Sequence, residues 1–172
     1  MLGSECHGRY TGRYSLLEKM KIESKYKLRT VKNGKPFYGE VILKMGLLSN
    51  SIEHELIEEY RGKGFQSQGY IESIPQKGYD SWKEGVRIGV DYALSMVSDN
   101  RKFKITILEA NGLTTDTNPI ILAFVASRAI LNEVKNKESE VELKKIEEIV
   151  FSSWNYGLGS QMNFENFTVE KK

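Results

Sequence analysis

The chain has 172 residues, with 25 Lys or Arg against 23 Asp or Glu, and its formal net charge is +2. This length suits one domain with its own hydrophobic core. A content of 40% hydrophobic and 28% charged residues is ordinary for a globular protein and gives no indication of disorder except at the two ends. This small net charge says little about partners, because a basic face could be offset by acidic residues elsewhere on the surface.

Cellular location and organisation follow from a few features of the sequence. The single cysteine, Cys6, excludes an internal disulfide and favours a reducing compartment. The run from Ile120 to Ala126 is too short to span a bilayer, and the first residues lack an apolar signal segment. We therefore expect a cytoplasmic protein. We divide it into a flexible arm (1–20), an α+β domain (21–136) and a C-terminal helix and tail (137–172).

The first elements form a predicted β-hairpin. Polar and apolar residues alternate from Tyr26 to Val31 and again from Phe37 to Met45, which is typical of strands. Between these two runs, Asn33-Gly34 is a strong hairpin-turn signal.

A short helix and a third strand are predicted next. Asn50 and Glu53 have the spacing of a capping box. Apolar residues follow at helical spacing: Ile52, Leu56, Ile57 and Tyr60. We expect this helix to end at Gly62 or Gly64, and a strand to run from Phe65 to Ile74.

The second half alternates helices and one strand. Ser81 and Glu84 form another capping box, and the apolar face that follows predicts a helix to Val97. Gly85 and Gly89 lie four residues apart beside that face, and we expect them to allow close approach to a sheet. A strand is predicted from Phe103 to Ile107.

Two further helices complete the prediction. Asn118-Pro119 places a capping residue before proline, and the apolar residues to Val134 indicate a central helix. Ser139 and Glu142 open an amphipathic C-terminal helix. The tail contains Trp154, Tyr156 and Phe164, and we expect these aromatic side chains to pack on the rest of the domain or on a partner. The predicted fold is α+β, with a four-stranded mixed sheet, helices on one face and an added C-terminal helix.

Several of these segments resemble domain IV of translation elongation factor G, which has the fold of ribosomal protein S5 domain 2. The likeness runs from about Tyr26 to Val134. Its motifs are Gly34-Lys35-Pro36-Phe37, Ile74-Pro75 with the following helix, and Asp116-Thr117-Asn118 with Ala123-Phe124. The resemblance implies an S5 domain 2-like fold and contact with RNA or the ribosome through loops at the tip of the domain.

The sequence also departs from that family. Residues 49–64 form an insertion, and Leu113 stands where the family carries a histidine at its tip. The 172 residues contain no G-x-x-x-x-G-K-[ST] phosphate loop, so we expect no GTPase activity from them. A stand-alone relative with a different task is therefore expected.

Candidate catalytic groups are few, and we predict no catalytic residue, no metal site and no cofactor. Ser67 lacks the G-x-S-x-G spacing of a nucleophile elbow and is interpreted as a strand residue. On a helix, His54 and Glu58 would share a face suited to zinc, but a third ligand is missing. The alternative for this pair is a solvated acidic helix face.

The predicted binding residues lie in loops at one end of the sheet. Thr114 to Asp116 precede a helix N-terminus, where free backbone N–H groups favour anions. Local capping by Asp116 or Asn118 is the alternative for this turn. With nearby lysines they form a small basic tip: Lys32, Lys35, Lys77, Thr114, Thr115 and Asp116.

Three functions remain open at this point. The first is a non-catalytic binding module that contacts RNA or the ribosome through the tip, with the segment from Arg9 to Tyr14 as a further RNA-stacking element or a solubilising arm. The second is a protein-binding inhibitor or immunity protein, which the acidic residues from Glu53 to Glu59 and the aromatic tail allow. The third is an enzyme of the same fold class. The sequence leaves the oligomeric state open, as well as whether the C-terminal helix packs in the same chain.

Overall fold

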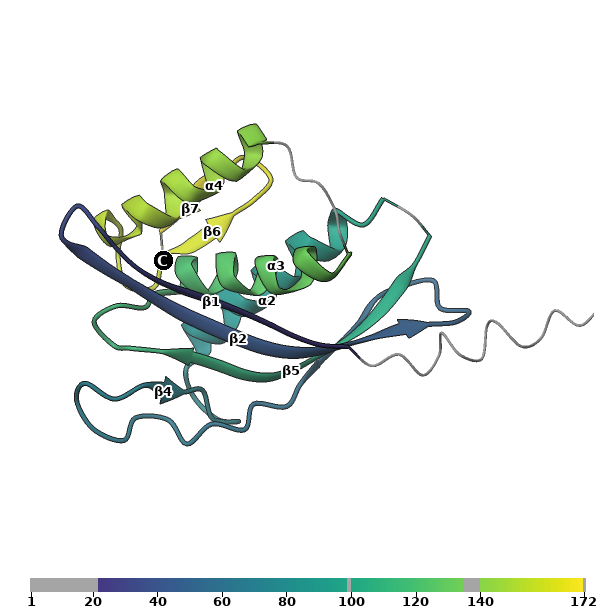
Figure 1. Ribbon diagram of the computed structural model, residues 1–172, viewed down its shortest axis with the longest axis horizontal. Coiled ribbons are helices and arrows are strands. Elements are labelled where there is room, and N and C mark those ends of the chain that lie inside the picture. Colours follow the sequence, from purple (N-terminus) through teal and green to yellow (C-terminus); the bar gives the residue numbers. More distant parts are fainter. Residues whose placement is uncertain (1–21, 99, 135–139, 172) are drawn as a thin grey trace, which may run out of the picture.

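The computed structural model describes residues 22–98, 100–134 and 140–171 (Figure 1). The N-terminal arm, with Cys6 and the Arg9–Tyr14 segment, lies outside the described residues. The elements in chain order are β1 (Ile22–Lys32), β2 (Lys35–Leu48), β3 (Glu55–Glu58), β4 (Glu72–Ser73), α2 (Asp80–Ser95), β5 (Lys102–Gly112), α3 (Pro119–Val134), α4 (Glu140–Ser152), η1 (Ser153–Asn155), β6 (Gln161–Asn163) and β7 (Thr168–Glu170).

The main sheet is mixed and has five strands in the described part of the chain. Its order is β1-β2-β5-β3, and the two-residue β4 also pairs with β5. β1 and β2 form the predicted antiparallel hairpin, whereas β3 runs parallel to β5. The predicted α+β class and mixed sheet are confirmed, and β3 adds one strand to the four expected.

The helices form a second layer on one face of this sheet. Figure 1 shows α2 and α3 against the sheet, with α4 and the β6–β7 hairpin beyond them. α3 is buried almost all round, as its sequence predicts. Asn118 caps it, because its Oδ1 accepts the backbone N–H of Ile121 at 3.0 Å. None of the helices in the described ranges is both long and apolar enough to cross a membrane.

The helix predicted between Asn50 and Tyr60 is wrong. Asn50 has a left-handed φ of 65°, and the chain then enters β3, where Leu56 pairs with Ile105. Ile52, counted toward the apolar helical face, is 91% exposed. Pairing with β5 therefore determines the secondary structure of this segment, and the helical spacing of its apolar residues is coincidental.

The strand predicted from Phe65 to Ile74 is also mostly wrong. Only Glu72 and Ser73 form a strand, and the residues before them make a loop in which Phe65, Tyr70 and Ile71 are exposed. Gly64 and Gly69 have left-handed φ values of 75° and 84°, which break an extended run. Ser67 lies in this loop rather than in a strand.

Helix α2 starts without the predicted capping box, and its two glycines contact a different element from the one expected. It begins at Asp80 after Tyr79, which has a left-handed φ of 59° and gives no side-chain cap, so the Ser81–Glu84 capping box is not formed. A Cβ at Gly85 would overlap the carbonyl of Pro119. The glycines thus allow close approach to helix α3, not to the sheet.

The C-terminal segment packs in the same chain. Ile146, Val150 and Phe164 belong to the main hydrophobic core. The Trp154 indole N–H donates to the carbonyl of Pro36 at 2.9 Å, and Phe151 lies edge-on to Phe37 at 5.2 Å between ring centroids. The start predicted at Ser139 lies outside the described residues, and α4 is described from Glu140.

Candidate nucleic-acid interface

Two of the predicted lysines lie on the turn of the β1–β2 hairpin. Asn33 and Gly34 have φ values of 52° and 73°, so the chain reverses in two residues and Lys32 pairs with Lys35. Both lysines are exposed. The ammonium of Lys32 lies 5.4 Å from the ring centroid of Phe151, and Lys35 donates to Asn155 at 3.2 Å. The C-terminal segment therefore braces this turn.

Strand β1, which leads into this turn, contains three more basic side chains. Lys25, Lys27 and Arg29 occupy alternate positions and therefore share one face of the strand. Tyr26, between them, packs against Phe124 of α3 on the opposite face, with 6.0 Å between ring centroids. The three cations thus lie on the face of the sheet that the helices leave open.

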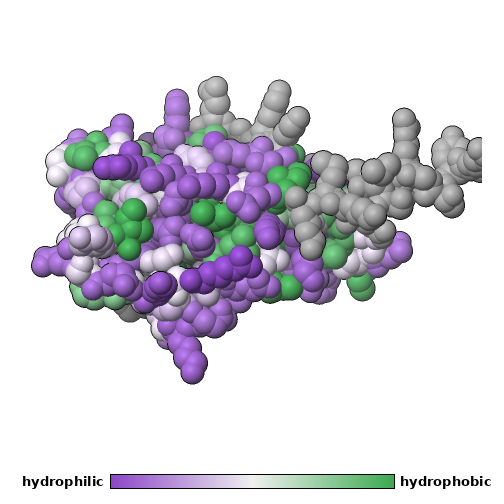
Figure 2. Space-filling view, turned by 60° about the horizontal axis from the view of Figure 1, so that its bottom comes forward, coloured by the Kyte–Doolittle hydropathy of each residue, from purple (hydrophilic) through white to green (hydrophobic). Residues whose placement is uncertain are grey.

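We call these five cations the basic row: Lys25, Lys27, Arg29, Lys32 and Lys35. Figure 2, turned so that the lower side of Figure 1 comes forward, shows mostly hydrophilic residues with small, separate hydrophobic groups. Lys25, Lys27 and Arg29 were not among the binding residues predicted from the sequence. Their period-two spacing was the available signal, but the partner strand had to be known before their face could be assigned.

A buried carboxylate anchors the start of the row. Glu40 is only 6% exposed, and its carboxylate lies 2.7 Å from the Lys25 Nζ and 3.9 Å from the Lys27 Nζ. It also accepts a hydrogen bond from the Asn111 amide at 2.9 Å. Burial alone would raise the pKa of Glu40, but the hydrogen bonds from Lys25 and Asn111 outweigh it and lower the pKa. Glu40 therefore remains a fixed anion that orients both lysines.

The turn after β5 contains the other predicted tip residues except Lys77. The carbonyl of Asp116 accepts the backbone N–H of Tyr38 at 2.8 Å, which places the turn beside β2. Thr115 donates to the Asp116 carboxylate at 2.6 Å. Thr114 donates to the carboxylate of the buried Glu72. These side chains are held by hydrogen bonds to carboxylates, so this part of the tip is a rigid, partly acidic edge beside the basic row.

Glu72 also ties the β4–α2 loop to this end of the sheet. The Tyr79 hydroxyl donates to its carboxylate at 2.6 Å. Burial and this carboxylate raise the pKa of Tyr79 to about 12, so the phenol stays protonated at neutral pH.

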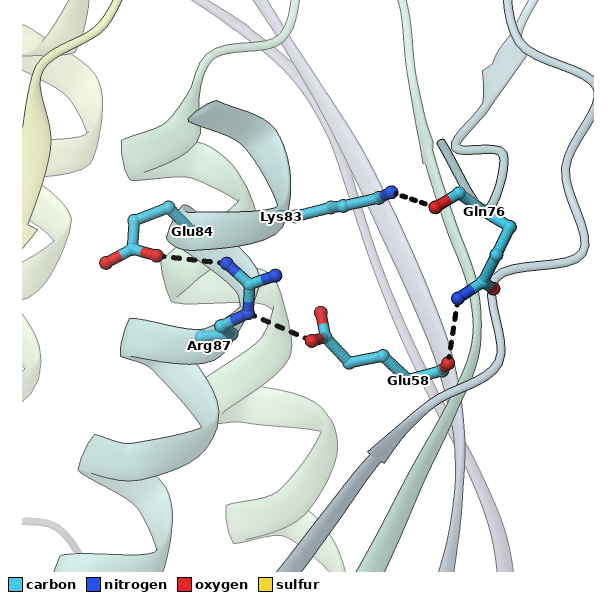
Figure 3. A network of polar contacts seen from close by, with 5 residues as sticks. All are labelled: Glu58, Gln76, Lys83, Glu84 and Arg87. Atoms are coloured by element: carbon cyan, nitrogen blue, oxygen red, sulfur yellow. Dashed lines mark hydrogen bonds and ion pairs between the residues drawn. The ribbon is translucent and has the colours of Figure 1, made fainter. Parts of the chain in front are cut away.

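Lys77 lies in this loop, on a different edge from the basic row. Figure 3 shows how the loop is held: Lys83 donates to the Gln76 carbonyl at 2.8 Å, and Arg87 bridges Glu58 and Glu84 at 3.0 and 3.1 Å. Lys77 itself is exposed. No described contact joins it to Lys32 or Lys35, so the lysines of the predicted tip divide between two loops.

His54 and Glu58 do not share a helical face, because residues 55–58 form a strand, so neither the zinc interpretation nor the acidic helix face applies. His54 is followed by an extended strand, and its Nδ1 accepts the backbone N–H of Phe103 at 3.1 Å. Glu58 pairs with Arg87 instead. Burial and then the nearby charge of Lys102 lower the pKa of His54, which favours the neutral ring. The described residues contain no group of three or more side chains placed to hold a metal ion.

Comparison with known proteins adds little to this picture. The sequence matches no protein-family model, and a search of curated proteins finds no match. Among solved structures, the chain is similar to a protein from Thermus thermophilus, with a TM-score of 0.49 and 17% sequence identity. The similarity covers 65% of this chain and 15% of that chain. At this level it carries no argument about family or function.

Proposed function

We propose that this protein is a non-catalytic, cytoplasmic binding module that contacts RNA through the basic row and the adjoining tip loops. The observation that carries the proposal is the alternation of Lys25, Lys27 and Arg29 along one face of an edge strand that ends in the exposed Lys32–Lys35 turn. Cations in alternate positions of a strand lie about 6.7 Å apart, which forms an extended track for a phosphate backbone.

Two further features support binding rather than catalysis. His54, a candidate general base, uses its ring nitrogen as an acceptor for the backbone N–H of Phe103. Ser67, a candidate nucleophile, lies in an exposed loop. An activated nucleophile needs a base within hydrogen-bond reach, and the His54 nitrogen that could serve is already occupied by the backbone.

The resemblance to domain IV of elongation factor G supports RNA, and the ribosome in particular, as the partner. The motifs of that resemblance fall on the hairpin turn, on the loop before α2 and on the turn after β5. The same three loops carry Lys32 and Lys35, Lys77, and Thr114 to Asp116. The hairpin turn and the turn after β5 adjoin the basic row, whereas Lys77 lies on a different edge, so the RNA contact is proposed for the first two loops.

RNA binding at two salt concentrations tests the proposal. We expect labelled single-stranded RNA to bind in fluorescence anisotropy, with a log–log salt slope of roughly −3 if about four phosphates are neutralised. A DNA strand of the same sequence tests whether the 2′-hydroxyl contributes. Absence of RNA binding at low salt, or binding that does not weaken with salt, would contradict the proposal.

A further inference from the structure

A second surface differs from the basic row in composition and in charge. A groove of about 790 Å³ runs between α2, α4 and the β6–β7 hairpin. Five carboxylates line it: Glu84, Asp91, Glu142, Glu165 and Glu170. Among the described residues that line this acidic groove, none is Lys, Arg or His.

The floor of the acidic groove is apolar and aromatic. The rings of Tyr92 and Phe164 stack with centroids 4.0 Å apart and an interplanar angle of 6°. Met162 is buried beside them, while Ile88 and Phe167 are half-buried. Aromatic residues and methionine are enriched where proteins bind other proteins, so this floor suits apolar side chains of a partner.

The carboxylates concentrate negative charge at the rim. Asp91 and Glu165 are exposed, whereas Glu84 already pairs with Arg87 at 3.1 Å. Partial desolvation and then the charge of Glu84 raise the pKa of Asp91, because two like charges disfavour each other. Nearby, the ammonium of Lys145 lies 5.4 Å from the ring centroid of Phe167, so this ring is already engaged by a cation of the same chain and a partner's cations are left to the carboxylates.

We propose that the acidic groove binds a short, basic, amphipathic segment of a partner protein. Apolar side chains of that segment would cover the Tyr92–Phe164 floor, and its Lys or Arg side chains would reach Asp91 and Glu165 at the rim. RNA is repelled by this rim, and a purely apolar ligand brings no counter-charge to these two carboxylates. The inference goes beyond the RNA proposal and does not depend on it.

A designed peptide tests this inference on the full-length chain. The probe is a labelled amphipathic helix about four turns long, with lysines on one face and leucines on the other. Its matched partner carries glutamate in place of each lysine. We expect the lysine peptide to bind in fluorescence anisotropy, to weaken as salt rises, and to shift NMR signals of Tyr92 and Phe167. The glutamate peptide should not bind.

Two triple variants with equal changes in charge localise the binding. The groove variant combines Asp91→Asn, Glu165→Gln and Glu170→Gln, and the control combines Glu53→Gln, Glu55→Gln and Glu59→Gln. We expect the groove variant to lose roughly tenfold or more in affinity for the lysine peptide, and the control to lose less than about threefold. Equal losses in the two variants would show diffuse charge attraction and overturn the inference.

A second copy of the chain in the groove would have a distinct signature. If a second copy of this chain covers the groove, sedimentation would show a dimer that the groove variant dissociates, and this result would overturn the inference. If the groove fails to bind either peptide, the inference is wrong. RNA binding by the basic row would be untouched by either result, so the two proposals fail separately.

Discussion

Gly89 of α2 faces the backbone carbonyl of Ala123 in α3 so closely that a Cβ at Gly89 would overlap its oxygen. One turn earlier, Gly85 has the same relationship to Pro119. The two helices therefore run side by side in the same direction with their backbones in contact. This contact fixes where α3 begins, and so the turn from Leu113 to Thr117 that precedes it.

Replacement of Gly89 by alanine should be destabilising. Alanine favours a helix by about 1 kcal/mol over glycine, but the added methyl meets backbone, which has no rotamer to adopt. We expect a net loss of about 1–3 kcal/mol in the free energy of unfolding, measured in urea. Gly46→Ala is the control, because nothing lies within 4 Å of a Cβ there. A neutral Gly89→Ala would show that the helices separate freely.

Asn118 joins a helix cap to the C-terminal segment. Its Oδ1 caps α3 at Ile121, and its Nδ2 donates to the hydroxyl of buried Ser153 at 2.9 Å. Asn118→Ala removes both bonds and should cost about 2–3 kcal/mol of stability. Asn118→Asp keeps an acceptor for both the N–H of Ile121 and the Ser153 hydroxyl, so it should cost less than about 1 kcal/mol. Equal losses in thermal or urea denaturation would argue against the cap.

His54 should make stability depend on pH. Its neutral Nδ1 accepts the Phe103 N–H, and its pKa is lowered in the folded state. The unfolded chain therefore binds the proton more readily below about pH 6.5, and acidification through this range should lower the melting temperature. The His54 contribution is fully present above that pH. His54→Gln keeps an acceptor without a charge and should flatten the profile between about pH 5 and 7. An NMR titration that gives His54 a pKa above 6.5 would contradict the assignment.

Charge removal along the basic row should reduce RNA binding more than equal removal elsewhere. The row variant combines Arg29→Gln, Lys32→Gln and Lys35→Gln, and leaves the two lysines that pair with Glu40. The control variant combines Lys63→Gln, Lys144→Gln and Lys171→Gln, which lie outside the row. We expect the row variant to reduce the magnitude of the log–log salt slope by roughly 2, and the control to leave it nearly unchanged. A separate Lys77→Gln variant measures whether the RNA footprint reaches the loop before α2.

Two short-range motifs were predicted correctly, although the Ser81–Glu84 capping box did not form. Asn33-Gly34 forms its turn and Asn118 its cap, because each motif needs only its immediate neighbours. The helix predicted at Asn50 failed since residues 55–58 are held by β5, about fifty positions later in the chain. Local spacing carries no information about such a partner.

In the candidate site, too, residues of one local turn were predictable, whereas residues brought together from distant parts of the chain were not. Lys32 and Lys35 were predicted together because one turn contains both, and the hairpin confirms their pairing. Glu40 gave no local signal, because its burial depends on Asn111 and on the lysines of β1. The acidic groove combines residues of α2, α4 and the last hairpin, whose packing no spacing rule predicts.

The parallel pairing of β3 with β5 also has a consequence for the order in which the chain folds. The hairpin of β1 and β2 closes through a two-residue turn, whereas Glu55 and Lys104 meet across 49 positions that include α2. Closing the longer loop costs more entropy, so we expect the hairpin to form early and β3 to dock late. Substitutions at Leu56 should then speed unfolding and leave the folding rate nearly unchanged, while those at Val41 should slow folding.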